Sequence, residues 1–315
     1  MLDILSITGT IFVVISAGFL AVRVGPFSSG DMQTLGKFVV NFALPALILR
    51  AVSTQPIGEF ANIGYLGSVL IGSLVVFWAG YLWSRSVAGE NAAASAFSAM
   101  GMSCANSGFI GFPILLVALP DVAATALAMN MIVENLVMIP LVLIMAEYAH
   151  AGGSTRPQMI RKIAKRLVRN PIVIALALGL FLSASKVTLP AVIARPIDLF
   201  ASASAAVSLA VIGGTLAALP FKALKPAVFR IALGKLILHP LAVGISLLGL
   251  SQIGFGAKDE RLVAAAIILA STPVMSIYPI LARSSGEEST ASLAMLVMTV
   301  VSFLTMSVIL SVVLN

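Results

Sequence analysis

Long apolar runs follow one another along the whole chain, separated by short stretches of charged residues, glycine and proline. Each run is close to the roughly 20 residues that a helix needs to cross a hydrocarbon core, and the pattern predicts about ten such spans. Helices are expected because open strands leave backbone groups unsatisfied in lipid. The predicted spans are 4–24, 35–53, 61–84, 92–118, 122–147, 171–189, 196–219, 228–251, 261–283 and 289–314.

The composition places this all-α chain in the bilayer. Hydrophobic residues make up 60% of the 315 residues and charged residues only 10%. Soluble globular chains are about 45–50% apolar and about 25% charged, so lipid is the expected solvent and partner. The spans and their loops leave no room for a soluble domain.

The basic residues indicate how the chain is oriented. The net charge is +7, which on a soluble protein would suggest nucleic acid. Here thirteen of the 19 basic residues fall in one set of loops and five in the other, while Lys235 lies inside a span. Because positive loops face the cytoplasm, we expect a multi-pass protein of the cell inner membrane, with both termini outside the cytoplasm and no nucleic-acid partner.

The chain divides into two halves around its one long loop. We expect an N-terminal five-helix repeat at 1–147, a cytoplasmic basic linker at 148–170 and a C-terminal repeat at 171–315. The basic run in the linker predicts an amphipathic stretch at the anionic inner leaflet. Because five is an odd number of spans, the second half would enter the membrane in the opposite orientation, as an inverted repeat. GFPILL at 111–116 and IYPILA at 277–282 lie at matching positions, in the fourth and ninth spans.

The fourth and ninth spans contain the strongest candidate site. Two glycines and a proline within 106–113 would break a helix in mid-membrane, and the ninth span has prolines at 273 and 279. Matching broken segments in both halves point to a transporter's binding site, because unpaired amides at restarted helix ends attract anions. The candidate substrate-binding residues are Asn106, Ser107, Gly108, Phe109, Gly111, Pro113, Ser271, Thr272, Pro273, Ser276, Tyr278, Pro279 and Asn41.

An alternative interpretation is a pair of proline kinks with glycines at helix contacts, as membrane bundles often have. Pro113 and Pro279 suit the first turn of a restarted helix, where a missing N–H costs nothing. Asn41 precedes Pro45 in the second span and could either face the substrate path or satisfy a kink there.

Ionisable residues inside spans are a second signal, because they are costly at depth and usually functional. Glu134, beside Asn135 in the fifth span, could carry a proton or cation, position the site as an ion-pair partner, or serve as a structural carboxylate. For His239 we favour a packing hydrogen bond ahead of Pro240. Lys235, on the same helix face, could snorkel to the cytoplasmic surface.

Other chemistry has little support in the sequence. Two histidines, His150 and His239, and the single Cys104 cannot assemble an ordinary metal cluster. The chain has no HExxH, GxSxG or phosphate-cradling Walker motif. We therefore expect no enzyme activity, cofactor or bound metal.

Several segments together resemble the auxin efflux carrier family, whose bacterial members include malonate and malate permeases. The resemblance covers nearly the whole chain and rests on the order and spacing of the segments. They are NFALPALIL (41–49), NSGFIGFPI (106–114), RNPIVIALALG (169–179), VIGGTLA (211–217), GKLILHPL (234–241), ASTPVMSIYPILA (270–282) and EESTAS (287–292).

The resemblance implies two inverted five-helix repeats with broken, crossing helices 4 and 9. Spans 1, 2, 6 and 7 would form a scaffold, and spans 3–5 and 8–10 a transport domain that moves like an elevator, as in the bile-acid symporters and some sodium/proton antiporters. It implies a small carboxylate as cargo, with Asn106, Pro113 and Pro279 at the crossover. The short central loop is similar to that of bacterial rather than plant members.

The function expected from the sequence is therefore secondary active or facilitative transport of small mono- or dicarboxylates. One alternative is a sodium- or proton-coupled symporter or antiporter of the bile-acid symporter-like superfamily. Another is a membrane sensor that binds its ligand without moving it. The sequence leaves open protons or Na⁺ as coupling partners and a homodimer as the assembly.

Overall fold

The computed structural model describes residues 2–149, 156–218, 225–257 and 259–314. Every regular element within these ranges is a helix, as the apolar pattern predicts. The first half contains α1 (Leu2–Arg23), α2 (Ser29–Phe38), η1 (Val39–Ala43), α3 (Leu44–Thr54), α4 (Ile57–Phe60), α5 (Ile63–Ser86), α6 (Ala92–Ser103), η2 (Ser107–Gly111), α7 (Phe112–Ala118), α8 (Pro120–Val133), η3 (Glu134–Met138) and α9 (Ile139–Ala149).

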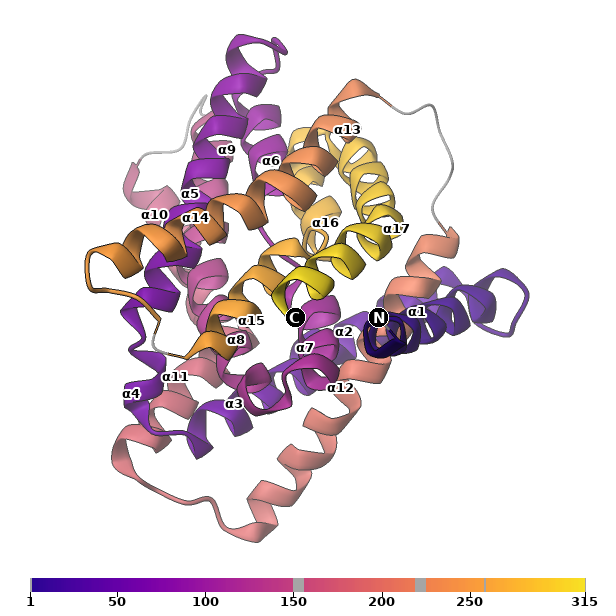
Figure 1. The fold of residues 1–315 in the computed structure, drawn as a ribbon. Coiled ribbons are helices and arrows are strands. Elements are labelled where there is room, and N and C mark those ends of the chain that lie inside the picture. The colour runs from indigo at the N-terminus through magenta and orange to yellow at the C-terminus, as the bar shows by residue number, and fades with distance from the viewer. Residues whose placement is uncertain (1, 150–155, 219–224, 258, 315) are drawn as a thin grey trace.

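The linker and second half are helical in the same way (Figure 1). They contain α10 (Arg156–Val168), α11 (Pro171–Ser185), α12 (Ala191–Ala218), α13 (Pro226–Leu233), η4 (Gly234–Leu238), α14 (His239–Gln252), α15 (Glu260–Ser271), α16 (Tyr278–Ala282), η5 (Arg283–Ser285) and α17 (Glu288–Val313). The predicted linker at 148–170 falls partly outside the described residues.

Within the described ranges, seven helical segments are long and apolar enough to cross a membrane. They are Ser29–Thr54, Ile57–Ser86, Ala92–Ala118, Pro120–Ala149, Ala191–Ala217, Pro226–Gln252 and Glu288–Val313. An eighth results if Ile160–Val168 and Pro171–Ser185, which meet at 64°, count as one span. The expected number was about ten. The two further predicted spans are the shorter apolar helix Thr8–Arg23 and the interrupted pair α15 and α16, so the ten-helix repeat stays a prediction.

Asparagine side chains begin several of these helices. The side-chain oxygens of Asn62, Asn91 and Asn170 accept hydrogen bonds from the backbone amides of Tyr65, Ala94 and Ile172, at 2.9–3.0 Å. Such caps pair donors that a helix start otherwise leaves unsatisfied. They fix where α5, α6 and α11 begin.

Four helices pass through a proline by forming a π-helical turn. The turns η1, η2, η3 and η4 each end two residues before a proline, namely Pro45, Pro113, Pro140 and Pro240. A proline has no N–H and its ring clashes with the carbonyl four residues earlier. The extra residue of a π turn absorbs this mismatch, so these segments continue instead of breaking at the proline.

The helices pack in two groups. In one, α12 packs against α1, α2 and α3, and α11 against α3; in the other, α5 packs against α6 and α14, and α17 against α13, α15 and α16. The contact of α1 with α12 is very close, because a Cβ on Gly213 would lie 1.8 Å from the carbonyl oxygen of Ile15. The first group meets the rest of the molecule where α3 contacts α8 and where α12 contacts η2.

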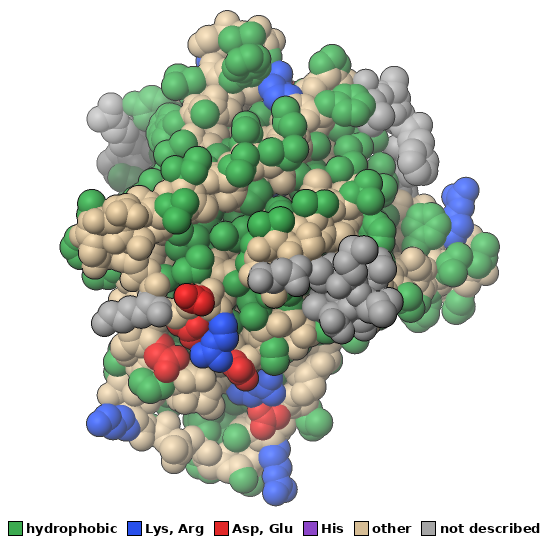
Figure 2. All heavy atoms as spheres, in the orientation of Figure 1, with side chains coloured by type: hydrophobic (Ala, Val, Ile, Leu, Met, Phe, Trp, Pro, Cys, Tyr) green, Lys and Arg blue, Asp and Glu red, His purple; other side chains and the backbone are tan. Residues whose placement is uncertain are grey.

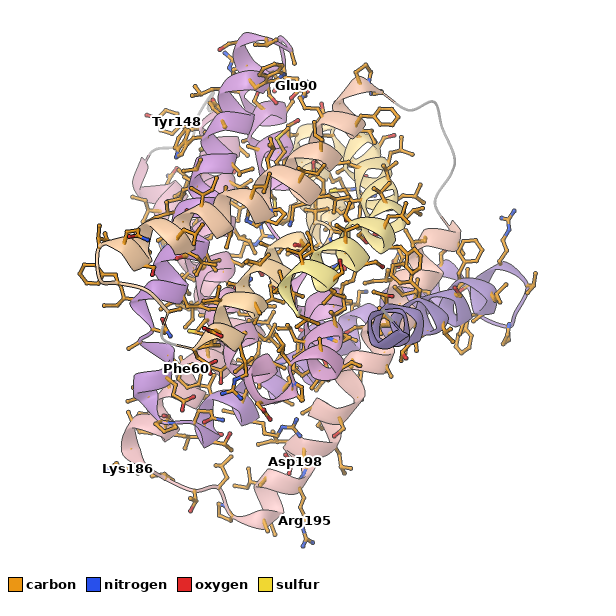
Figure 3. All side chains as sticks on the ribbon, in the orientation of Figure 1. Phe60, Glu90, Tyr148, Lys186, Arg195 and Asp198 are labelled. Atoms are coloured by element: carbon orange, nitrogen blue, oxygen red, sulfur yellow. The ribbon has the colours of Figure 1, made fainter. Side chains whose placement is uncertain are left out.

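The outer surface is largely apolar. Figure 2 shows hydrophobic side chains spread over the middle of the visible face, with charged ones gathered below. The side chains of Val24 and Val192 are 80% and 85% exposed. A surface with this much exposed apolar area is better suited to contact with lipid than with water. Charged residues lie at opposite ends of the molecule, with Glu90 at one end and Lys186 and Arg195 at the other (Figure 3).

Candidate functional site

Both predicted breaks are present in the structure. In the fourth span α6 ends at Ser103, the chain is extended at Cys104 (φ −103°, ψ 130°), and the helix restarts at Ser107. In the ninth span α15 ends at Ser271 and α16 begins at Tyr278, so residues 272–277 are not helical. Each break leaves backbone groups inside the protein that need partners.

The two breaks meet at Asn106. Its backbone amide donates to the carbonyl oxygen of Pro273 at 2.8 Å and to the hydroxyl of Thr272 at 3.0 Å. Its side-chain nitrogen donates to Ser276 Oγ at 2.9 Å, and its side-chain oxygen accepts from the amide of Phe109 at 3.3 Å. Asn106 thus caps η2 and ties it to the break of the ninth span.

A buried carboxyl lies beside the restarted helix. Ser107 Oγ donates to Glu134 Oε1 at 2.6 Å, and the backbone amide of Ala105 and the side chain of Asn130 also hydrogen-bond to this carboxyl. Asn130 donates to Ser107 Oγ at 3.1 Å and accepts from Tyr65 OH at 2.9 Å. A negative group at a helix N-terminus is favoured by the helix dipole, so Glu134 stabilises the start of η2.

A buried basic pair lies at the other break. Lys235 Nζ donates to the carbonyl oxygen of Ala270, in the last turn of α15. His239 Nδ1 lies 3.1 Å from the same oxygen and 3.0 Å from Nζ, and His239 Nε2 lies 2.9 Å from Ser73 Oγ. A positive group at a helix C-terminus is favoured by the dipole. Lys235 is 0% exposed and does not reach the surface, contrary to the snorkelling interpretation.

The two buried charges do not touch. Within the described part of the chain, no ion pair of 4.0 Å or less joins Glu134 to Lys235. Each is instead held by hydrogen bonds and by a helix end. The ion-pair interpretation therefore does not describe this conformation.

Most other predicted residues surround the crossing. The buried ones are Gly108, Phe109, Gly111, Pro113, Ser271, Pro273, Tyr278 and Pro279. A Cβ on Gly111 would lie 2.4 Å from Leu269 Cδ2, so a larger residue there would displace the Leu269 side chain. Pro279 lies in the first turn of α16, the helix that follows the second break. Pro113 lies in α7, one element further on, because η2 forms the first turn after the first break.

Two predicted residues lie apart from the crossing. Asn41 is exposed, and its side-chain nitrogen donates to the carbonyl oxygen of Lys37 at 2.8 Å within its own helix, as expected for a residue that satisfies a kink. Asn135 donates to the carbonyl oxygen of Met131 at 3.0 Å and accepts from Asn170 at 3.2 Å. Asn135 therefore links η3 to the start of α11.

Three residues not predicted from the sequence complete the two buried networks, namely Tyr65, Asn130 and Ser73. Asn130 precedes Glu134 by one helical turn, so it shares its face. That spacing in an apolar span was the available signal. Tyr65 and Ser73 lie on α5, and only the folded chain brings them to these partners.

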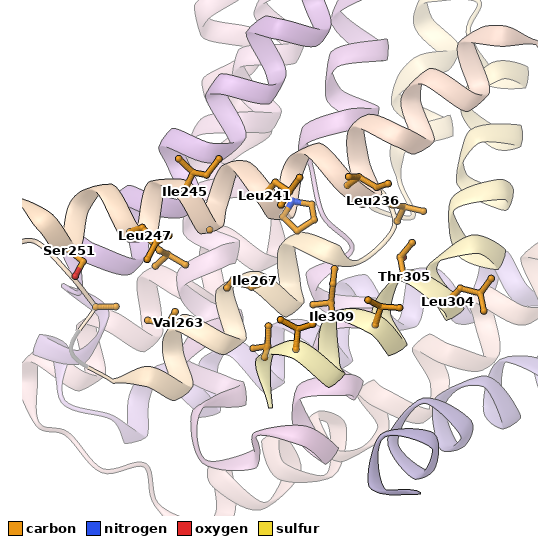
Figure 4. Close-up of a pocket in the computed structure, with 18 residues that line it drawn as sticks. Leu236, Leu241, Ile245, Leu247, Ser251, Val263, Ile267, Leu304, Thr305 and Ile309 are labelled. Atoms are coloured by element: carbon orange, nitrogen blue, oxygen red, sulfur yellow. The ribbon is translucent and has the colours of Figure 1, made fainter. Parts of the chain in front are cut away.

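Two cavities lie elsewhere, and neither is lined by a predicted site residue. An apolar one of about 780 Å³ lies between α14, α15 and α17 and includes Leu241 and Ile309 (Figure 4). A polar one of about 610 Å³ lies at the N-terminal end of α15 and includes Asp121, Asp259 and Arg261. Hydrogen bonding by the Arg261 side chain lowers the pKa of Asp259 below its usual value.

The crossing is closed in this conformation, because Asn106, Ser107 and Thr272 are each at most 4% exposed. Among the described residues, no three His, Cys, Asp or Glu side chains are grouped to hold a metal ion. His150 lies outside those residues.

Comparison with known proteins finds similarity to membrane transport proteins. The model of the family described as "Membrane transport protein" matches residues 8–310. A protein of Rhizobium meliloti (strain 1021), named "Putative malonate transporter", is 28% identical over 314 residues, covering 98% of this chain and 95% of its own length.

Proposed function

Because the chain belongs to the membrane transport protein family, that of the auxin efflux carriers, we propose that it carries small organic acid anions across the membrane. The observation that carries this proposal is the meeting of two broken helices at Asn106. Broken helices in corresponding positions are where secondary transporters bind solute. The family membership confirms the resemblance seen in the sequence motifs.

The helix ends at the crossing favour a carboxylate. The amides of Ser107 and Gly108 stand at the first two positions of η2, where a helix provides no acceptor. α16 begins two residues after Ser276, which pairs with Asn106, and amides at a helix start attract anions. Ser276 Oγ accepts from Asn106, so its own O–H can donate to a solute, whereas the Thr272 hydroxyl donates to the carbonyl oxygen of Leu269. The name of the Rhizobium relative makes malonate the first dicarboxylate to test.

The packing of the helices supports an elevator movement. We assign the group around α12 to a scaffold and the group around α5 and α17 to a transport domain that carries the crossing. Ten spans in two inverted repeats would then place the breaks in the fourth and ninth spans. The basic residues support both termini outside the cytoplasm of an inner membrane.

Cross-linking the two groups tests the elevator directly. A Cβ on Gly108 of η2 would lie 3.0 Å from Leu44 Cδ1 of α3, across the proposed boundary. In a Cys104→Ser background, oxidation of a Leu44→Cys/Gly108→Cys variant should stop transport, and reduction should restore it. Single-cysteine variants treated alike are the controls. Transport that continues with the two positions linked would rule out sliding at this boundary.

A measurement of solute uptake distinguishes a carrier from a sensor. Purified protein in liposomes should take up labelled malonate or a related mono- or dicarboxylate in a saturable way, with empty liposomes as the control. Binding without uptake would favour a sensor. Uptake that requires an imposed Na⁺ gradient would favour the sodium-coupled alternative.

A further inference from the structure

Lys235 and His239 form a buried pair that the anion site does not use. The two side chains are 0% and 2% exposed and stand one helical turn apart. Lys235 Nζ, His239 Nδ1 and the carbonyl oxygen of Ala270 form a triangle, with 3.0 Å between the two nitrogens. Two basic nitrogens in hydrogen-bond contact behave as one titrating unit.

This geometry suits a pair that carries one proton more than its uncharged form. A charged Lys235 donates to both Ala270 and an unprotonated His239 Nδ1, while His239 Nε2 donates to Ser73 Oγ. A second proton would bring two positive groups into contact without water, and like charges so close disfavour each other. The contact therefore defines a one-proton site.

The groups around the pair leave its charge without a paired carboxylate. Toward it face Ser73 from α5, the Ala270 carbonyl from α15 and Cys104 at the end of α6. Glu134 of η3 acts on it only from beyond ion-pair distance. The ionisable groups of the other two neighbouring helices are paired elsewhere, Arg230 of α13 with Glu90 and Glu288 of α17 with Arg283. A proton can leave this pair without breaking an ion pair.

The pair is joined to the crossing by a very short stretch of chain. Ala270 lies two residues before Thr272, whose hydroxyl accepts a hydrogen bond from the backbone amide of Asn106. Losing the charge at Ala270 removes the cation that stabilises the last turn of α15. Occupancy by a proton and the geometry of the anion site are therefore linked through Ser271 and Thr272.

We propose that Lys235 and His239 form the proton-binding site of this carrier, and that one proton moves with each organic anion. This inference rests on the proposed function. With one proton bound, the positive charge of the pair balances the negative charge of Glu134. Each bound proton therefore makes the carrier with its dicarboxylate one charge less negative inside the bilayer. The proton comes from water on one side and is released on the other.

The test measures protons moved per malonate in proteoliposomes that contain a pH-sensitive dye. In wild type, a malonate gradient should move protons in the same direction as malonate. Lys235→Arg should keep exchange of labelled for unlabelled malonate, while the protons moved per malonate fall about tenfold or more, because arginine keeps its proton on both sides of the membrane. Ser73→Ala, which removes a hydrogen bond but leaves the pair, should keep the wild-type ratio.

The outcomes separate this inference from the transport proposal. Wild-type malonate exchange without proton movement, or an unchanged ratio in Lys235→Arg, would overturn the proton site alone. Absence of exchange in wild type would overturn the transport proposal and this inference with it. If Lys235→Arg loses exchange, the double variant Lys235→Gln/His239→Gln decides, because neither amide releases a proton: exchange without proton movement supports the site, and a wild-type ratio refutes it.

Discussion

Replacing Asn106 by alanine removes the side chain that ties the two broken helices together. The backbone bonds from Asn106 to Pro273 and Thr272 remain, because they involve the main-chain amide. Two side-chain hydrogen bonds are lost, to Ser276 at 2.9 Å and from Phe109 at 3.3 Å. At about 0.5–1.5 kcal/mol each, the crossing loses about 1–3 kcal/mol.

This loss should appear in the affinity for malonate. Since ~1.4 kcal/mol is a factor of ten, the dissociation constant should rise about 5- to 150-fold in Asn106→Ala. Isothermal titration of the purified protein measures it directly. The matched control is Asn135→Ala, which removes an equally buried asparagine whose hydrogen bonds lie away from the crossing.

The thermal midpoints of the two variants provide the folding check. They should lie close together, because each variant loses the hydrogen bonds of one buried side-chain amide. Unchanged malonate affinity in Asn106→Ala, or an equal loss in Asn135→Ala, would refute the assignment of the anion site to the crossing.

Three further outcomes follow from the packing and the charges. Gly213→Ala should destabilise the protein by about 1–3 kcal/mol, seen as a lower Tm, because the new Cβ would lie 1.8 Å from the Ile15 carbonyl oxygen; an unchanged Tm would show that α1 and α12 separate freely. Glu134→Gln should lower malonate flux but keep the protons moved per malonate, and loss of the pH-driven component would instead make Glu134 the proton carrier. Replacing Arg161 of α10 and Arg169, which directly follows α10, by glutamine should reduce the stabilisation by anionic lipid by about 1 kcal/mol per charge, measured as Tm in nanodiscs with and without phosphatidylglycerol; an equal lipid effect in the variant would count against contact with the leaflet.

Much of the fold could be predicted from local sequence, because a lipid-spanning helix must satisfy its own backbone and show a long apolar run. The breaks at Asn106 and Thr272 were also predictable, since glycine and proline disrupt a helix through their own backbone properties. The π turns ahead of Pro45 and Pro240 were not, because the pattern shows a disruption but not how the chain absorbs it.

The buried networks depend on contacts between distant parts of the chain. Tyr65 meets Asn130, and Ser73 meets His239, across 65 and 166 residues. A single sequence shows that a polar residue lies in an apolar span but not which partner it finds. For this reason Lys235 was compatible with a snorkelling side chain until its contact with Ala270 was seen.

The central claim is that this chain moves a small carboxylate across a membrane. Uptake of labelled malonate into proteoliposomes preloaded with unlabelled malonate tests it most directly, because exchange needs no coupling gradient. We expect saturable, protein-dependent accumulation of label that Asn106→Ala weakens. No accumulation above empty liposomes for malonate and a panel of related mono- and dicarboxylates would contradict it.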